Sequence, residues 1–73
     1  MNTKYNGWKN RQTWNVALWI GNDQGLYNLA KECKSYAQFR DQMSTDATPD
    51  GVSWHDPKLS IRELNACIRE LQS

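Results

Sequence analysis

The sequence predicts an all-α fold: a compact bundle of three or four short helices with one long loop at about residues 45–59. Apolar residues recur at helical spacing in several segments, residues that cap helices precede them, and turn formers gather in one stretch. The 73 residues predict a single helical domain, with residues 1–12 as a polar N-terminal arm. A domain this small buries only about 60% of its unfolded surface, so its eight aromatic residues must supply much of the core.

A first helix is expected at residues 13–20. Its apolar side chains fall on two opposite sides, with Trp14, Ala17 and Leu18 on one and Val16, Trp19 and Ile20 on the other. Asn15 is the only polar break between them. A surface helix keeps one apolar stripe, so this helix must be covered on more than one side, by the rest of the chain or by a partner. Thr13, or Asn10 one turn earlier, can cap it, and Gly21-Asn22-Asp23 is expected to end it.

Two more helices are expected at residues 24–34 and from Ser35 to about residue 44. In the second helix, one buried stripe is predicted from i, i+3, i+4, i+7 spacing, consisting of Leu26, Leu29, Ala30 and Cys33. Ser35 and Gln38 have the spacing of a capping box, in which each side chain binds a free backbone N–H of the other residue. Tyr36, Phe39 and Met43 then line one side of the third helix.

The long loop follows from the turn formers Pro49, Asp50, Gly51 and Pro57, and Trp54 is expected to pin it to the helices. The last helix begins after Ser60, which forms a second capping box with Glu63. A narrow apolar seam is predicted along it, made of Ile61, Leu64, Ile68 and Leu71. The seam is expected to pack on the other helices, and a homodimer contact is the alternative.

The net charge of +1 hides an asymmetry along the chain. Residues 1–40 hold six basic and two acidic side chains, giving +4, whereas residues 41–73 hold three basic and six acidic ones, giving −3. The polar first ten residues and the short apolar runs predict neither a signal peptide nor a membrane span. We therefore expect a cytoplasmic protein. Cys33 and Cys67 are then small buried hydrophobes, with a bridge between them as the alternative.

No catalytic set or cofactor motif is recognisable in the sequence. His55 is the only histidine, and acid–base catalysis usually needs a positioned partner. Four loop residues could be imagined as metal ligands, but their spacing fits neither a calcium loop nor a zinc site: Asp46, Asp50, His55 and Asp56. We therefore expect no enzyme, no cofactor and no metal.

A protein-binding role is favoured because Trp, Tyr and Arg dominate the energetic centres of interfaces. The candidate contact residues are Trp8, Lys9, Arg11, Trp19 and Trp54, each tryptophan only if it remains partly exposed. The alternative is a small nucleic-acid-binding module, because basic and aromatic side chains that alternate can bind single strands. The N-terminal segment would bind the strand through these basic and aromatic residues: Lys4, Tyr5, Trp8, Lys9, Arg11 and Trp14.

One string of residues is specific enough to mark a family: Asn10-x-x-Thr13-Trp14-Asn15-Val16-x-Leu18-Trp19-x-x-Asn22-Asp23. Together with Asn6-Gly7-Trp8 and Leu26-Tyr27 it resembles a family of short uncharacterised proteins of bacteriophages and some bacteria. Gly51-Val52-Ser53-Trp54, Asp56-Pro57 and the closing helix are similar more loosely. The resemblance implies a phage or mobile-element origin, and small phage proteins often bind one host protein, host-defence components included. It therefore implies a non-enzymatic protein of the host cytoplasm that inhibits or redirects a host protein, and it carries over no site residues.

Overall fold

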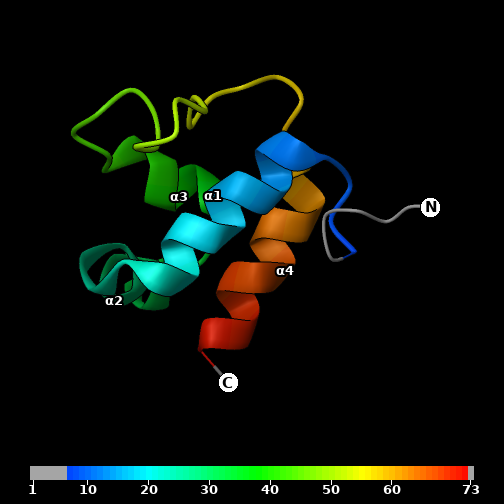
Figure 1. The fold of residues 1–73 in the computed structure, drawn as a ribbon. Coiled ribbons are helices and arrows are strands. Elements are labelled where there is room, and N and C mark those ends of the chain that lie inside the picture. The colour runs from blue at the N-terminus through cyan, green and yellow to red at the C-terminus, as the bar shows by residue number, and fades with distance from the viewer. Residues whose placement is uncertain (1–6, 73) are drawn as a thin grey trace.

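The computed structural model describes residues 7–72, and the helices of this part follow the predicted order. They are α1 (Arg11–Asn22), α2 (Gln24–Glu32), α3 (Tyr36–Asp41) and α4 (Ile61–Leu71). As Figure 1 shows, α1 crosses the middle of the molecule, and residues 42–60 arch over one end of it. Helix α1 contacts both α2 and α4, and α4 also contacts α2 and α3. The predicted all-α class is confirmed.

Helix α1 begins and ends two residues outside the predicted range. Asn10 is the cap, because its Oδ1 accepts hydrogen bonds from Thr13 N at 2.9 Å and from Thr13 Oγ1 at 2.7 Å. The polar arm therefore ends at Asn10, not at residue 12. Of the three residues expected to end the helix, Gly21 and Asn22 still continue it in helical conformation. The chain turns instead at Asp23, which ends α1 with its backbone N–H and caps α2 with its carboxylate.

The two capping boxes form only by half. Ser35 Oγ accepts from Gln38 N at 3.2 Å, but Gln38 Oε1 accepts from Lys34 N at 2.8 Å, one residue before the cap. In the same way Ser60 Oγ accepts from Glu63 N, whereas Glu63 Oε1 accepts from Lys9 N at 2.9 Å. Both long side chains therefore bind a backbone N–H outside the box.

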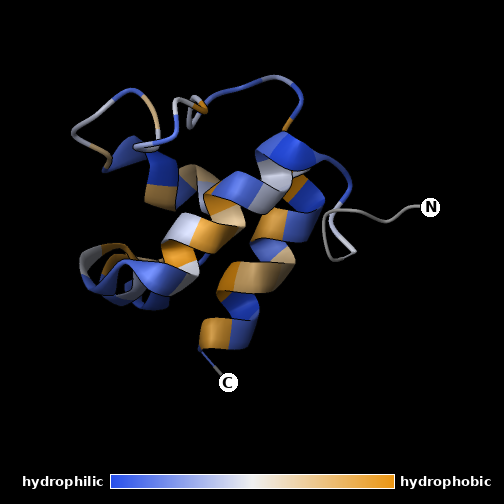
Figure 2. Ribbon diagram, in the orientation of Figure 1, coloured by the Kyte–Doolittle hydropathy of each residue, from blue (hydrophilic) through white to orange (hydrophobic). Residues whose placement is uncertain are grey.

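Helices α2 and α3 are shorter than predicted. Helix α2 ends at Glu32, with Cys33 as its extended C-cap, and α3 ends at Asp41 instead of about residue 44. Ala30 and Cys33 of the predicted α2 stripe are buried, while Leu26 and Leu29 are partly buried against the same core. Figure 2 shows hydrophobic residues on the helices and a mostly hydrophilic loop after α3. In residues 7–72 no helix is both long and apolar enough to cross a membrane.

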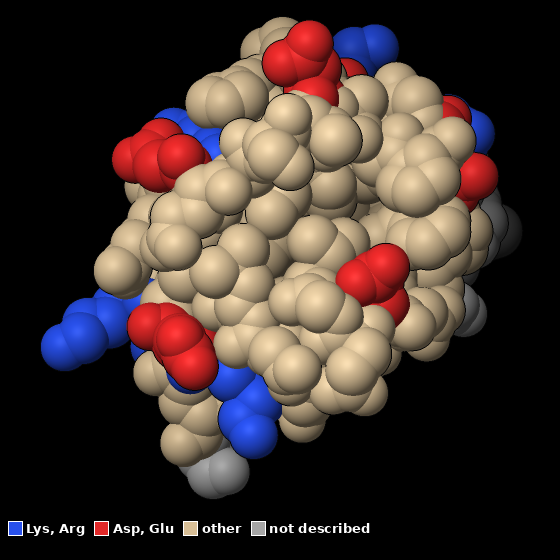
Figure 3. Space-filling view, turned by 90° about the vertical axis from the view of Figure 1, so that its left-hand side faces the viewer, with Lys and Arg blue, Asp and Glu red and all other residues tan. Residues whose placement is uncertain are grey.

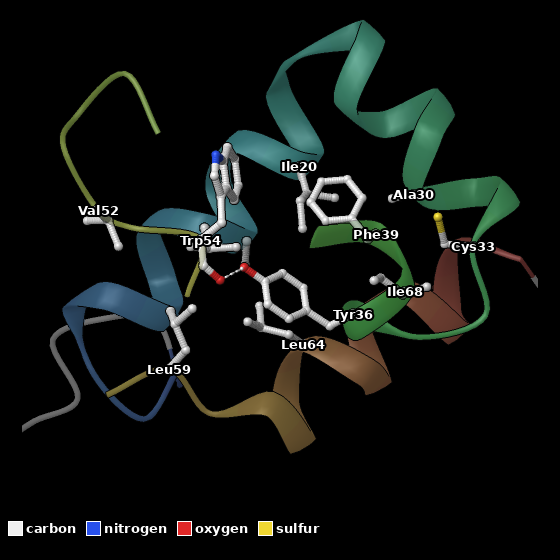
Figure 4. Close-up of a cluster of buried hydrophobic side chains, with 12 residues drawn as sticks. Ile20, Ala30, Cys33, Tyr36, Phe39, Val52, Trp54, Leu59, Leu64 and Ile68 are labelled. Atoms are coloured by element: carbon white, nitrogen blue, oxygen red, sulfur yellow. Dashed lines mark hydrogen bonds between the residues drawn. The ribbon is translucent and has the colours of Figure 1, made fainter. Parts of the chain in front are cut away.

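The core forms where α3, α4 and the long loop meet α1 (Figure 4). Trp54 is 2% exposed and packs edge-on against Phe39, with ring centroids 5.9 Å apart. Tyr36 Oη donates to the Trp54 carbonyl oxygen at 2.7 Å. Trp54 thus pins the loop to α3, as predicted. Leu64 and Ile68 of the α4 seam are fully buried and Leu71 is partly buried against the core, so the seam packs inside the molecule except at Ile61, which is exposed.

Candidate functional site

A polar clasp holds the long loop on α1: Asn15 and Thr48 form its buried part, and Asp50 and Trp19 form its more exposed part. Asn15 is 1% exposed; its Oδ1 accepts from Thr48 Oγ1 at 2.7 Å and its Nδ2 donates to Asp50 Oδ2 at 2.8 Å. Trp19 Nε1 donates to the same Asp50 oxygen at 3.0 Å. These two hydrogen bonds lower the pKa of the Asp50 carboxyl below its ordinary value. The polar break of the first helix is therefore an anchor for the loop.

The backbone around Asp50 is shaped to meet α1. Gly51 has a φ of 93°, which only glycine adopts readily, and its N–H donates to the Thr48 carbonyl oxygen at 2.8 Å. The Val52 N–H donates to Thr48 Oγ1 at 3.1 Å, while an antiparallel bridge pairs Ala47 with Ser53. The predicted turn at residues 49–51 is thus a tight hairpin-like turn that presents Thr48 and Asp50 to Asn15.

Thr13 joins α1 to the start of α4 in the same manner. It is fully buried, and its Oγ1 accepts from Ser60 N at 2.9 Å while it donates to Asn10. Asn10 Nδ2 in turn donates to the Lys58 carbonyl oxygen at 2.6 Å. The segment before α1 is consequently fixed against the segment before α4, and this brings Trp8 beside α4.

The five candidate contact residues end in different places. Trp54 is in the core, where a partner cannot reach it, and Trp19 is half-buried with its indole N–H bound to Asp50. Arg11 is exposed at the first turn of α1. Trp8 is half-buried against the core, and Lys9 binds Glu63 through its backbone. Of the five, Trp8 and Lys9 lie together next to α4.

A groove of about 350 Å³ lies between Trp8 and α4. The described residues that line it are Gly7, Trp8, Glu63, Ala66, Cys67 and Glu70. A second hollow, of about 820 Å³, shares Glu63 with it, and Lys9, Leu59, Ser60, Ile61 and Arg62 are its other described lining residues. Among residues 7–72, Ile61 is the one large hydrophobic residue that is exposed, with 36% of its surface accessible to solvent. We call the first of these the Trp8–α4 groove.

The sequence contains a signal for the α4 wall of this groove that is separate from the apolar seam. Glu63, Ala66, Cys67 and Glu70 follow i, i+3, i+4, i+7 spacing, so they form a stripe roughly 120° around the helix from the seam. The partner of that stripe, Trp8, lies more than fifty residues away in the chain, and no local pattern connects the two.

The groove is acidic at its ends and apolar in between. Glu63 and Glu70 are its only charged residues among those described. Burial raises the pKa of the Cys67 thiol, and the neighbouring Glu70 carboxylate raises it further. Cys67 is therefore a protonated, half-buried part of the wall, and both Cys67 and Cys33 are free thiols.

The face formed by α2, α3 and the start of the long loop is of another kind. Figure 3 shows a broad area of it without Lys, Arg, Asp or Glu, and charged side chains lie mainly around its edge. The exposed residues of these elements include the uncharged polar residues Gln24, Asn28, Gln38, Gln42 and Ser44, beside the charged residues Lys31, Glu32, Asp41 and Asp46. This face is uncharged without being apolar, so it offers no large hydrophobic anchor.

The residues considered for catalysis or metal binding are engaged in turns or exposed. His55 is exposed, and its backbone N–H donates to Ser53 Oγ. The Asp56 carboxylate accepts from Lys58 N at 2.8 Å, and Asp50 belongs to the clasp. Within residues 7–72 there is no group of three or more His, Cys, Asp or Glu that could hold a metal ion.

The basic and aromatic residues near the N-terminus do not form one continuous described surface. Lys4 and Tyr5 lie outside the described residues. Trp8 faces α4, and Trp14 is half-buried on α1. The described part of this segment therefore joins an acidic groove and forms no cationic track.

Comparison with known proteins gives a family and no function. Residues 1–46 match the family described as "Family of unknown function (DUF7249)". No curated protein and no solved structure matches the chain. The matched region contains the Thr13–Trp19 string and Trp8, while Thr48, Asp50 and the α4 wall of the groove lie beyond it.

Proposed function

We propose that this chain, which belongs to the Family of unknown function (DUF7249), is a non-enzymatic, phage-type protein that binds a host protein and modulates or inhibits it. The observation that carries the proposal is the Trp8–α4 groove, in which a partly exposed indole faces Ala66 and Cys67 on a stripe of α4. The groove volume of about 350 Å³ is in the lower range of natural binding pockets.

Trp8 suits the role of an interface anchor because its neighbours are fixed before any partner arrives. Lys9 N donates to Glu63, and Asn10 binds the backbone at Lys58, so the chain on the C-terminal side of Trp8 is held against α4. Tryptophan is enriched among residues that dominate binding energy, and a preordered anchor loses less conformational entropy on binding.

The chemistry of the site supports binding more than catalysis. The groove holds two carboxylates and a thiol whose pKa is raised, which is the opposite of what an activated cysteine nucleophile needs. The groove also disfavours nucleic acid as a ligand, because the Glu63 and Glu70 carboxylates would repel phosphates. The host partner and a role against host defence are proposed from the resemblance to phage proteins.

The test is a pull-down from bacterial lysate with the full chain and two matched variants. Trp8→Ala removes the anchor, whereas Tyr27→Ala removes another half-buried aromatic, which lies under Lys31 on α2. We expect the unchanged protein and Tyr27→Ala to recover the same stoichiometric protein. Trp8→Ala should bind that protein at least about tenfold more weakly while its circular dichroism is unchanged.

Two results would count against the proposal. One is the absence of any stoichiometric protein partner, and the other is full retention of the partner by Trp8→Ala. Recovery of nucleic acid, with an affinity that falls steeply as salt rises, would support the rival module instead.

A further inference from the structure

The second hollow lies where the segment before α1 meets the start of α4, and it shares Glu63 with the Trp8–α4 groove. Its volume of about 820 Å³ is within the range of natural binding pockets. Two apolar residues line it, of which Leu59 is buried and Ile61 is exposed. We call this site the Ile61 hollow, because Ile61 is the side chain that a ligand there can cover.

Hydrogen bonds between distant parts of the chain fix the shape of the Ile61 hollow. Lys9 N donates to Glu63 Oε1 at 2.9 Å, and Ser60 N donates to Thr13 Oγ1 at 2.9 Å. These contacts hold the segment before α1 and the start of α4 together in the folded chain. The hollow is therefore formed before any ligand arrives, and a preformed site loses less conformational entropy on binding.

The side chains that line the Ile61 hollow carry an excess of positive charge. Lys9 and Arg62 are basic and exposed, and Glu63 is the one acidic residue among the described lining residues, so two positive charges stand against one negative charge. Glu63 is half-buried, and one of its oxygens is held by the Lys9 N–H. A ligand that covers Ile61 therefore lies next to two basic side chains from different segments of the chain.

Neither a second copy of this chain nor a nucleic-acid strand matches this pattern well. In a symmetric dimer the same surface of both copies would meet, so two hollows with an excess of positive charge would face each other. A nucleic-acid strand carries a phosphate at every nucleotide, so it would bring negative charge to Glu63 as well. A peptide can instead place one carboxylate beside Lys9 and Arg62 and an uncharged group beside Glu63.

We infer that the Ile61 hollow binds an acidic segment of the partner protein, in which an Asp or Glu lies next to a large apolar side chain. The apolar side chain packs on Ile61, and the carboxylate pairs with Lys9 and Arg62. A basic segment would bring like charges to two exposed cations, and an uncharged segment would gain no attraction from them. This inference rests on the proposed function, because it extends the same interface past Glu63 and adds the chemistry of the partner.

The experiment is selection of a displayed random-peptide library on the folded full chain, with peptides that also bind Ile61→Ala removed. This step demands contact with the hollow without choosing a charge. We expect enriched peptides to carry Asp or Glu next to an aliphatic or aromatic residue. A synthetic copy of the most enriched peptide should bind Arg62→Glu at least about fivefold more weakly at low salt, and Arg62→Gln should show an intermediate loss.

Lys34→Glu is the matched control for Arg62→Glu. Lys34 is exposed before the cap of α3 and does not line the hollow, so this equal charge reversal should leave peptide binding unchanged. Lys34 and Arg62 are both exposed, so neither reversal removes a buried side chain, and circular dichroism should show the same helix content in both variants.

The outcomes separate this inference from the proposed function. If the Ile61-dependent peptides are basic or uncharged, or bind Arg62→Glu as well as the unchanged protein, the acidic partner is refuted. If no Ile61-dependent peptide is enriched, the hollow is not a docking site and the inference fails. In both cases the Trp8–α4 groove stands or falls by the Trp8→Ala pull-down.

Two further results would assign the Ile61 hollow to another ligand and refute the inference. One is a dimer, seen by sedimentation at several concentrations, that Ile61→Ala dissociates. The other is a labelled single-stranded oligonucleotide that binds the unchanged protein more tightly than the peptide does and loses that affinity in Arg62→Glu.

Discussion

Replacing Asn15 with alanine tests whether the clasp on α1 stabilises the fold. Asn15 is 1% exposed and bridges Thr48 and Asp50 from the centre of α1. Alanine removes the acceptor of the Thr48 hydroxyl and one of two donors to the Asp50 carboxylate. Thr48 is itself 4% exposed, so water cannot readily replace the lost partner.

The expected loss of stability can be built from these contacts. The Thr48–Asn15 hydrogen bond contributes about 1 kcal/mol, and a buried O–H donor left without its acceptor costs about 1–3 kcal/mol, although Thr48 Oγ1 still accepts from Val52 N. The Asp50 carboxylate is open to water, so we assign no energy to its lost bond. Alanine regains about 0.5 kcal/mol of helix propensity. We expect a net loss of about 2 kcal/mol, which for a domain of this size lowers Tm by about 8–16 °C.

Urea denaturation followed by far-UV circular dichroism measures this loss, and a double-mutant cycle assigns it. Thr48→Val removes the other partner, so the two changes together should cost about 1 kcal/mol less than their sum. Asn28→Ala is the matched control, because Asn28 is exposed on α2 and its side chain accepts from the neighbouring Gln24 side chain. A loss below about 0.5 kcal/mol for Asn15→Ala, or additive losses in the cycle, would refute the clasp.

Further predictions concern Tyr36, Asp50 and the two cysteines. Tyr36→Phe leaves the Trp54 carbonyl without its buried donor and should cost about 1–2 kcal/mol in urea denaturation. Because burial raises the Tyr36 pKa, its contribution is complete below the ordinary tyrosine pKa of about 10 and is lost at higher pH, so tyrosinate absorbance from this residue should appear only with unfolding. Hydrogen bonds lower the Asp50 pKa. The contribution of Asp50 to stability is therefore present above the ordinary aspartate pKa of about 4 and is lost as pH falls through the lowered pKa. The Tm difference between Asp50→Asn and the unchanged protein should accordingly close in acid. Half-buried Cys67 should react with a thiol reagent before buried Cys33, and a protein partner bound in the groove should protect Cys67 alone.

The helices and most of the core could be predicted from the sequence because their signals are local. Helical spacing identified Leu64 and Ile68 as buried, and Ser35 and Ser60 cap the helices where their spacing indicated. Trp54 was correctly expected to pin the long loop because it is a large apolar residue among turn formers.

The parts that could not be predicted depend on residues far apart in the chain. Asn15 looked like a break in an apolar helix, since its partners Thr48 and Asp50 follow 33 and 35 residues later. The Glu63 side chain was expected to turn back on Ser60. In the fold its Oε1 instead accepts a hydrogen bond from the Lys9 N–H, 54 residues away. Trp8 was a candidate because of its residue type alone. The α4 wall that makes it part of a groove became visible only in three dimensions.

The most distinctive string of the chain is explained by folding, and this separates scaffold from binding surface. Thr13 and Asn15 are buried and hold residues 48–60 in place, so their side chains are not available to a partner. The proposed docking groove combines Trp8, from the region that matches the family, with a stripe of α4 beyond residue 46. Substitutions in the groove can therefore affect partner binding without touching the clasp. Trp8→Ala should weaken binding of the protein partner, whereas Asn15→Ala should lower stability while the folded molecules still bind that partner.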